Sequence, residues 1–139
     1  MKGQLVRHQL LSEQLLEVST QKMTIQKFED IIAWQKAQDL AAEIYRYFGS
    51  IKDFGFRDQI CRAAISISNN IAEGFDRGTN KEFSLFLSYA RASSSEIKSM
   101  LYLAERLCYV TTEEAERLRD LSSEISKIIN GLKKSITEH

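Results

Sequence analysis

The sequence contains no proline and only six glycines among its 139 residues. Proline disrupts a helix interior and glycine weakens it, so their scarcity favours a chain that is almost entirely helical. Histidine is nearly absent as well, because His8 and His139 lie at the two ends of the chain. A di-metal centre in a helix bundle needs Glu-x-x-His pairs on two helices, and this sequence has none. We therefore expect no metal and no cofactor.

Cysteine is also scarce. Cys61 and Cys108 are far apart and show neither Cys-x-x-Cys nor metal-ligand spacing, so both are expected to be small, buried, apolar residues that stay reduced. Serines are numerous, but no histidine in the middle of the chain can serve them as a general base. An acid–base pair formed by Glu73 and Glu96 is the remaining enzymatic alternative, and ion-paired or solvated roles are favoured for both. We predict that the protein is not an enzyme.

Neither sign of charge dominates, because 19 basic residues balance 19 acidic ones. A neutral total argues against a histone-like polycation, but it permits a local basic patch, since the field depends on the distribution of charge. No apolar run approaches the roughly 20 residues of a membrane span. Polar residues interrupt the N-terminal leucines, so this segment does not have the continuous apolar stretch of a signal peptide. A soluble, cytoplasmic protein that contacts no membrane is expected.

Four segments repeat apolar residues at steps of three and four, which predicts amphipathic helices over about residues 28–48, 56–78, 79–110 and 112–136. Thr79 and Thr111 each precede a glutamate by three residues and predict capping boxes at two helix starts. Glycines at 74 and 78 predict the end of the second helix. Because the connections are short, we predict an all-α, antiparallel up-down-up-down four-helix bundle. The predicted buried faces include Ile31, Trp34, Ala37, Ala41, Ile44, Tyr45 and Phe48 in the first helix, and Phe56, Ile60, Ala63, Ala64, Ile67, Ile71 and Phe75 in the second.

This bundle domain is expected to comprise residues 23–139. Residues 1–22 form an N-terminal extension, for which two interpretations stay open. Its leucines could line a short helix that docks on the bundle or on a neighbour. Alternatively Met23 is the natural start, and the extension is not native.

Beside the apolar face of the second helix runs a polar line, which consists of Asp58, Arg62, Ser66, Asn69, Glu73 and Arg77. The third helix carries a similar line of Ser84, Ser88, Arg91, Ser95 and Lys98. If these helices pack side by side, the two lines form one hydroxyl-rich, arginine-bearing face that suits phosphate oxygens. Two alternatives remain: a surface laced with salt bridges, or a subunit interface, in which arginine and tyrosine are commonly enriched.

Four ordered motifs carry a family resemblance: Phe28–Ala37, Phe56–Ile60, Asn70–Gly74 and Asn80–Phe83. They resemble the bacterial four helix bundle protein family, which is encoded by intervening sequences inserted in 23S rRNA genes. That family is similar to the accessory variability protein of diversity-generating retroelements. The resemblance spans about residues 24–136.

The resemblance implies a ring-like homopentamer, and in the retroelement branch a basic surface that engages nucleic acid and a reverse transcriptase. Carried over by position, the candidate nucleic-acid contacts are Arg57, Arg62, Arg77, Lys81 and Arg91, and the candidates for helix or subunit packing are Trp34, Asn70 and Glu73. The family usually has a proline where this chain has Ser68, so a kink that depends on that proline is in doubt.

These observations predict a non-enzymatic, oligomeric helical bundle that binds structured RNA or another nucleic acid through a basic face. One alternative is a scaffold that docks a partner protein, such as a reverse transcriptase, without touching nucleic acid. Another is a vestigial structural protein of a mobile insertion.

Overall fold

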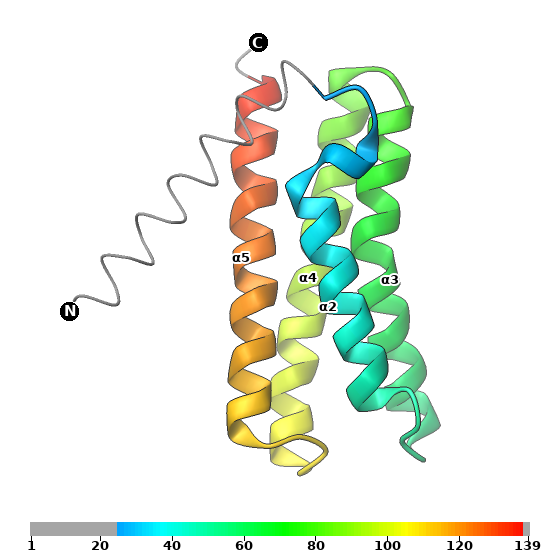
Figure 1. The fold of residues 1–139 in the computed structure, drawn as a ribbon, viewed down its shortest axis with the longest axis vertical. Helices are drawn as coiled ribbons and strands as arrows, with labels where there is room; N and C mark the ends of the chain where they lie inside the picture. The colour runs from blue at the N-terminus through cyan, green and yellow to red at the C-terminus, as the bar shows by residue number, and fades with distance from the viewer. Residues whose placement is uncertain (1–24, 138–139) are drawn as a thin grey trace, which may run out of the picture.

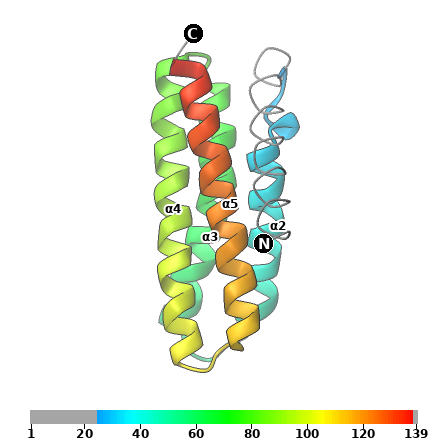
Figure 2. The ribbon, with the colours of Figure 1, turned by 90° about the vertical axis from the view of Figure 1, so that its left-hand side faces the viewer.

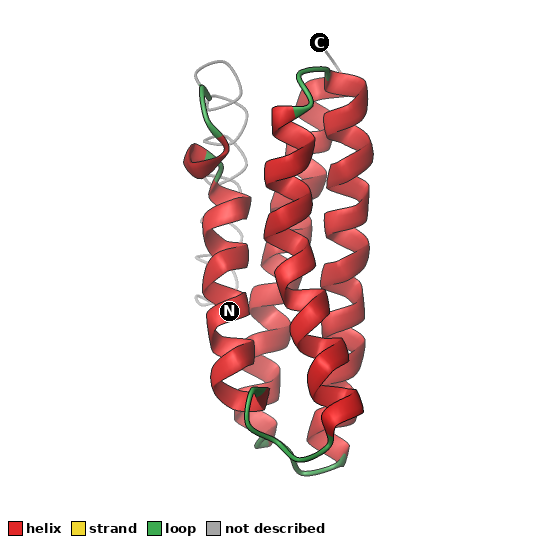
Figure 3. Cartoon of the chain, turned by 90° about the vertical axis from the view of Figure 1, so that its right-hand side faces the viewer, coloured by secondary structure: helices red, strands yellow, loops and turns green. Residues whose placement is uncertain are grey.

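The structure is a computed structural model that describes residues 25–137. A 3-10 turn, η1 (Phe28–Asp30), precedes four helices: α2 (Ile32–Phe48), α3 (Phe54–Asp76), α4 (Asn80–Arg106) and α5 (Thr112–Thr137). Successive helices run in opposite directions, and the loops gather at the two ends of the bundle (Figures 1 and 3). The described residues contain no strand. The predicted all-α, up-down-up-down four-helix bundle is confirmed, while the N-terminal extension 1–22 and both histidines lie outside the described residues.

The first predicted helix is divided in two. Ile31 is extended (φ −78°, ψ 120°) and separates η1 from α2. Its side chain is fully buried, and the Gln35 side-chain amide donates a hydrogen bond to the Glu29 carbonyl (2.9 Å). The break therefore anchors Ile31 in the core and turns the chain into α2.

The core is built from the faces that the periodicity predicts, with one correction in α2. Tyr45 is 47% exposed, whereas Ala33 and Leu40 are fully buried. The buried stripe of α2 consists of Ala33, Ala37, Leu40, Ile44 and Phe48. Because consecutive residues differ by about 100° around a helix, Tyr45 follows buried Ile44 but leaves the core. Cys61 is buried as expected, but the expectation for Cys108 is wrong, because this residue is exposed after the end of α4.

Both predicted capping boxes cap a helix. Thr79 Oγ1 accepts from the Glu82 backbone N–H (3.2 Å) at the start of α4. At the start of α5 the box is reciprocal, because Thr111 Oγ1 accepts from Glu114 N–H (3.1 Å) and Glu114 Oε1 accepts from Thr111 N–H (2.9 Å). The turn between α3 and α4 is therefore set by local sequence, as is the start of α5.

The two glycines at the end of α3 have different roles. Gly78 has a φ of +88° and provides the left-handed residue of the turn. Gly74 lies inside α3 and is buried, and a Cβ at this position would lie 2.4 Å from Phe86 Cβ. The prediction that the helix ends near Gly74–Gly78 is confirmed, because α3 ends at Asp76. Only Gly78 makes the left-handed turn, whereas Gly74 lets α3 and α4 approach closely.

Ser68, which stands where a proline was expected, lies within an unbroken α3. Its hydroxyl accepts a hydrogen bond from Gln38 Nε2 of α2 (3.0 Å). Serine retains the backbone N–H that proline lacks, so the helix stays continuous here. No helix in the described part of the chain is long and apolar enough to span a bilayer.

Candidate nucleic-acid interface

Arg57 and Arg62 lie in the first half of α3. The Arg57 guanidinium pairs with Asp58 (2.9 Å) and lies 4.7 Å from the centroid of the Phe54 ring. Arg62 is exposed, and no carboxylate of the described residues lies within salt-bridge distance of it. Of these two arginines, Arg62 is the one whose positive charge no carboxylate of the described residues neutralises, so it can contact a ligand.

Arg77 and Lys81 lie at the opposite end of the bundle, because 20 residues of helix separate Arg57 from Arg77 by about 30 Å. Arg77 pairs with Glu73 (2.9 Å), lies 3.9 Å from a Glu82 oxygen and stacks 4.9 Å above the Phe86 ring. Lys81 is exposed in the first turn of α4. These cations therefore do not form one patch with Arg57 and Arg62.

The candidate packing residues make contacts within the protomer. Trp34 packs edge-to-face against Phe28, with ring centroids 5.3 Å apart. Asn70 Nδ2 donates to the carbonyl (2.8 Å) and the hydroxyl (2.9 Å) of Ser66, one turn earlier in α3. Glu73 is the salt-bridge partner of Arg77.

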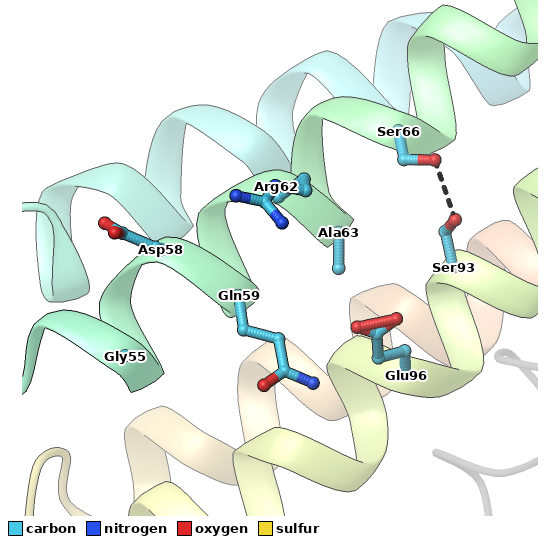
Figure 4. Close-up of a pocket in the computed structure, with 8 residues that line it drawn as sticks. All are labelled: Gly55, Asp58, Gln59, Arg62, Ala63, Ser66, Ser93 and Glu96. Atoms are coloured by element: carbon cyan, nitrogen blue, oxygen red, sulfur yellow. Dashed lines mark hydrogen bonds between the residues drawn. The ribbon is translucent and has the colours of Figure 1, made fainter.

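An open groove of about 590 Å³ lies between α3 and α4 (Figure 4). Ser93 Oγ donates to Ser66 Oγ (2.9 Å) across it. Arg62 lines this groove together with two carboxylates, Asp58 and Glu96. Since Arg57 already neutralises Asp58, Arg62 and Glu96 leave this groove with no net positive charge, and the face between α3 and α4 does not suit a polyanion.

The polar line of α4 faces α5, not α3. Arg91 Nη1 donates to Asn130 Oδ1 (2.9 Å), and Lys133 Nζ donates to Ser88 Oγ. Figures 1 and 2 show α4 and α5 side by side. The expectation that Arg91 and Arg62 share one face is therefore wrong, because helical periodicity orients a side chain relative to its own axis and does not specify the neighbouring helix.

The two facing lines form a polar surface that we name the α4–α5 seam. It consists of Ser84, Ser88, Arg91, Ser95 and Lys98 of α4 and Ser123, Ser126, Asn130, Lys133 and Thr137 of α5. On α5 these residues recur at steps of three and four, as they do on α4. The seam is about 21 Å long, since each line spans 14 residue steps.

The charge along the seam is positive. Residues 84–98 and 123–137 contain five cations, Arg91, Lys98, Lys127, Lys133 and Lys134. Their only carboxylates are Glu96 and Glu124. Glu96 lines the groove toward α3, and Glu124 pairs with Lys36 of α2 (2.9 Å), so both lie away from the seam.

The seam ends before Arg119, the next cation towards the start of α5, because a carboxylate neutralises this arginine. Arg119 pairs with Glu105 (2.9 Å) and stacks 4.1 Å from the centroid of the Tyr102 ring. Below the seam, towards the start of α5, the sequence also becomes acidic, with Asp120 and Glu116. The positive surface is therefore confined to the last fifteen described residues of α5 and the part of α4 beside them.

The α5 half of the seam was missed in the sequence. Its signal in the sequence is the recurrence of polar residues at steps of three and four from Ser123 to Thr137, on the same helix as the apolar residues that predict the buried face.

Nothing in the described residues assembles a metal-binding cluster of three or more His, Cys, Asp or Glu side chains. Ser94 and Ser122 are buried and hydrogen-bond to each other (2.8 Å).

Comparisons with known proteins agree with this fold. A family model described as 23S rRNA-intervening sequence protein matches residues 29–131. A crystal structure of a protein with unknown function from the S23 ribosomal protein family, from Bacteroides thetaiotaomicron VPI-5482, is similar with a TM-score of 0.69 and 28% sequence identity. That similarity covers 74% of this chain and 99% of the other. No curated protein matches.

Proposed function

Because this chain belongs to the family of 23S rRNA-intervening sequence proteins, we propose that it binds structured RNA through the α4–α5 seam and catalyses no reaction. The cytoplasm is where it would meet such RNA. One observation carries the proposal: three cations, Arg91, Lys98 and Lys133, and a row of hydroxyls share a surface about 21 Å long from which both nearby carboxylates are directed away.

Phosphate recognition follows from these groups. Arginine and lysine neutralise phosphates, and serine, threonine and asparagine donate hydrogen bonds to phosphate and sugar oxygens. The seam places Arg91, Lys98 and Lys133 next to such donors. No aromatic ring lies among the seam residues, so binding there is electrostatic and insensitive to base sequence.

A salt titration with a blunt-ended RNA duplex tests the proposal. We expect affinity to fall steeply as salt rises, with a slope of about −3 if about three phosphates are contacted. Replacing both Lys98 and Lys133 by alanine should weaken binding by at least about tenfold and reduce that slope by about two. Neither lysine has a carboxylate partner among the described residues, so the fold should survive the double substitution.

The matched control is Arg62→Ala combined with Lys81→Ala, which also removes two cations that have no carboxylate partner among the described residues, but from other faces. Its duplex affinity should stay close to that of the unaltered protein. Equal losses in the two double variants would contradict a site at the seam. Absence of binding at low salt would overturn RNA recognition altogether.

A second candidate function, self-association or docking of a partner protein, is favoured by the outer face of α4. Its exposed apolar residues form a stripe in two groups, Leu85, Tyr89 and Ala92 in the first half of α4, and Leu103 with the cap residue Leu107 at its end. Steps of three and four within each group are typical of a helix face that packs against another helix. The stripe supports assembly into the ring-like homopentamer that the resemblance implies, and a protein partner is its alternative occupant.

Light scattering during size-exclusion chromatography tests this candidate. If copies assemble through the stripe, the mass of the unaltered protein is a multiple of 16.0 kDa. The double variant Tyr89→Glu with Leu103→Glu should then have the mass of a single chain. Asn69→Glu with Gln35→Glu, on exposed positions of α3 and α2, is the control that adds the same charge. A monomeric unaltered protein would exclude self-association through this face.

A further inference from the structure

A small hollow on the α2–α3 side of the bundle combines an aromatic ring with two arginines. It has a volume of about 300 Å³ and opens to solvent. Its lining comes from the end of α2 and the first half of α3, and consists of Tyr45, Gly49, Arg57, Asp58, Cys61, Arg62 and Ile65. The α4–α5 seam lies on the other pair of helices.

The walls and floor of this hollow are apolar. Tyr45 is 47% exposed and Ile65 39% exposed, so both present surface to an incoming group. Cys61 is buried, and burial raises the pKa of its thiol, so the floor is uncharged. A flat, uncharged ring can therefore enter beside Tyr45 without leaving a buried charge unpaired.

The rim is cationic. Arg57 is held by the Phe54 ring (4.7 Å) and by Asp58 (2.9 Å), which it neutralises. Arg62 has no carboxylate within salt-bridge distance among the residues described. The three charged side chains carry a net charge of +1, and the charge in excess lies on Arg62.

This combination suits a nucleotide better than a protein surface. A stable protein interface buries about 800 Å² on each partner, whereas the exposed apolar side chains here are limited to Tyr45, Ile65 and the neighbouring Phe54. Unpaired bases, by contrast, stack singly on exposed aromatic rings, while arginine contacts the backbone.

We propose that the hollow binds one unpaired base of single-stranded RNA, stacked on Tyr45, with Arg62 contacting the adjoining phosphate. The site rests on the proposed RNA-binding function but lies on a different face. A protein that holds a duplex at the seam would thereby also engage a single-stranded segment. The exposed ring of Tyr45 is the surface on which the base would stack.

The test uses a fluorescein-labelled single-stranded RNA of ten nucleotides, measured by anisotropy at low salt. Tyr45→Ala should weaken binding about tenfold, and Tyr45→Phe should retain it, because stacking needs the ring and not the hydroxyl. Arg62→Gln should lower the salt slope by about one. Photo-crosslinking of the same RNA carrying 4-thiouridine should modify Tyr45 or a peptide next to it.

Tyr102→Ala is the matched control, since Tyr102 is 54% exposed but lies on α4, away from the hollow. It should leave single-strand affinity unchanged, and blunt duplex affinity should be unaffected by Tyr45→Ala. Unchanged single-strand affinity in Tyr45→Ala overturns the hollow even if duplex binding at the seam holds. Conversely, Tyr45-dependent single-strand binding without duplex binding upholds the hollow and overturns the seam. A change of oligomeric mass in Tyr45→Ala with unchanged RNA affinity would identify a subunit contact instead.

Discussion

Arg91 of α4 donates a hydrogen bond to Asn130 of α5 over 2.9 Å. The partner is a neutral amide, so the guanidinium is held in place while its positive charge stays uncompensated. This distinguishes Arg91 from Arg57, Arg77 and Arg119, each of which pairs with a carboxylate.

Replacing Asn130 by aspartate should therefore weaken RNA binding without removing any cation. The new carboxylate would neutralise Arg91 and reduce the potential along the seam, and we expect duplex affinity to fall by about threefold to tenfold at low salt. Thermal stability should stay equal or rise slightly, because a new exposed ion pair contributes about 0.2–1 kcal/mol. Binding titrations with thermal melts separate the two effects.

Asn69→Asp adds the same charge at an exposed position of α3 and is the control for that prediction. If both aspartate variants lose the same affinity, overall charge explains the loss and the seam does not.

Gly74→Ala should destabilise the bundle. The added Cβ would lie 2.4 Å from Phe86 Cβ, an atom fixed to the α4 backbone that cannot rotate away. We expect a loss of about 1–3 kcal/mol in the free energy of unfolding, which is larger than the gain in helix propensity from alanine. Urea denaturation followed by circular dichroism measures it.

The matched substitution is Gly55→Ala, also in α3. Its nearest neighbour would be Asp53 Oδ1 at 3.9 Å, an ordinary contact. This change should be neutral or stabilise by up to about 1 kcal/mol. Equal destabilisation by the two variants would show that close packing against Phe86 is not the cause.

The buried serines of α4 and α5 should be energetically coupled. Ser94 Oγ donates to the Ser122 carbonyl (2.9 Å), and Ser122 Oγ donates to the Ser94 carbonyl (2.8 Å). Each single alanine variant should lose about 1 kcal/mol of stability. The double variant should lose less than the sum, because each single variant already removes the 2.8 Å contact between the two hydroxyls, which can be lost only once. Strict additivity in a double-mutant cycle would contradict a shared network.

Stability should depend on pH through a bond between the two loops at one end of the bundle. The Tyr109 hydroxyl donates to Asp53 Oδ2 (2.7 Å). That bond, followed by the one from Phe56 N–H, lowers the pKa of Asp53, and the bond to Asp53 also raises the pKa of Tyr109. The Asp53 contribution is present above its unfolded pKa, about 3.9, and is lost as the pH falls through the lower folded value.

The contribution of Tyr109 to stability depends on pH in the opposite direction. It is present below the unfolded pKa, about 10, and is lost as the pH rises through the higher folded value. Tyr109→Phe should therefore reduce stability at neutral pH, flatten the acid decline and remove the alkaline decline. Urea unfolding at neutral pH, near pH 3 and near pH 11 tests this, and an unchanged pH profile would rule out the Asp53–Tyr109 bond as its source.

The sequence by itself determined the local features of this protein. Steps of three and four located the helices, and the threonine–glutamate boxes located the starts of α4 and α5. The positive φ of Gly78 follows from glycine at a helix end. These features depend on residues within one or two turns of each other, so a single segment contains the information.

Only the tertiary structure decided which helices share a face. It placed the Arg91 line beside α5, exposed Tyr45, and used Gly74 for close packing and not for a helix end. Periodicity gives the direction of a side chain relative to its own helix axis, but the neighbour that it meets depends on how four helices rotate and cross to bury their apolar stripes together. That choice is made by contacts between residues of different helices, such as Arg91 and Asn130, which are 39 positions apart, and no single amphipathic segment encodes it.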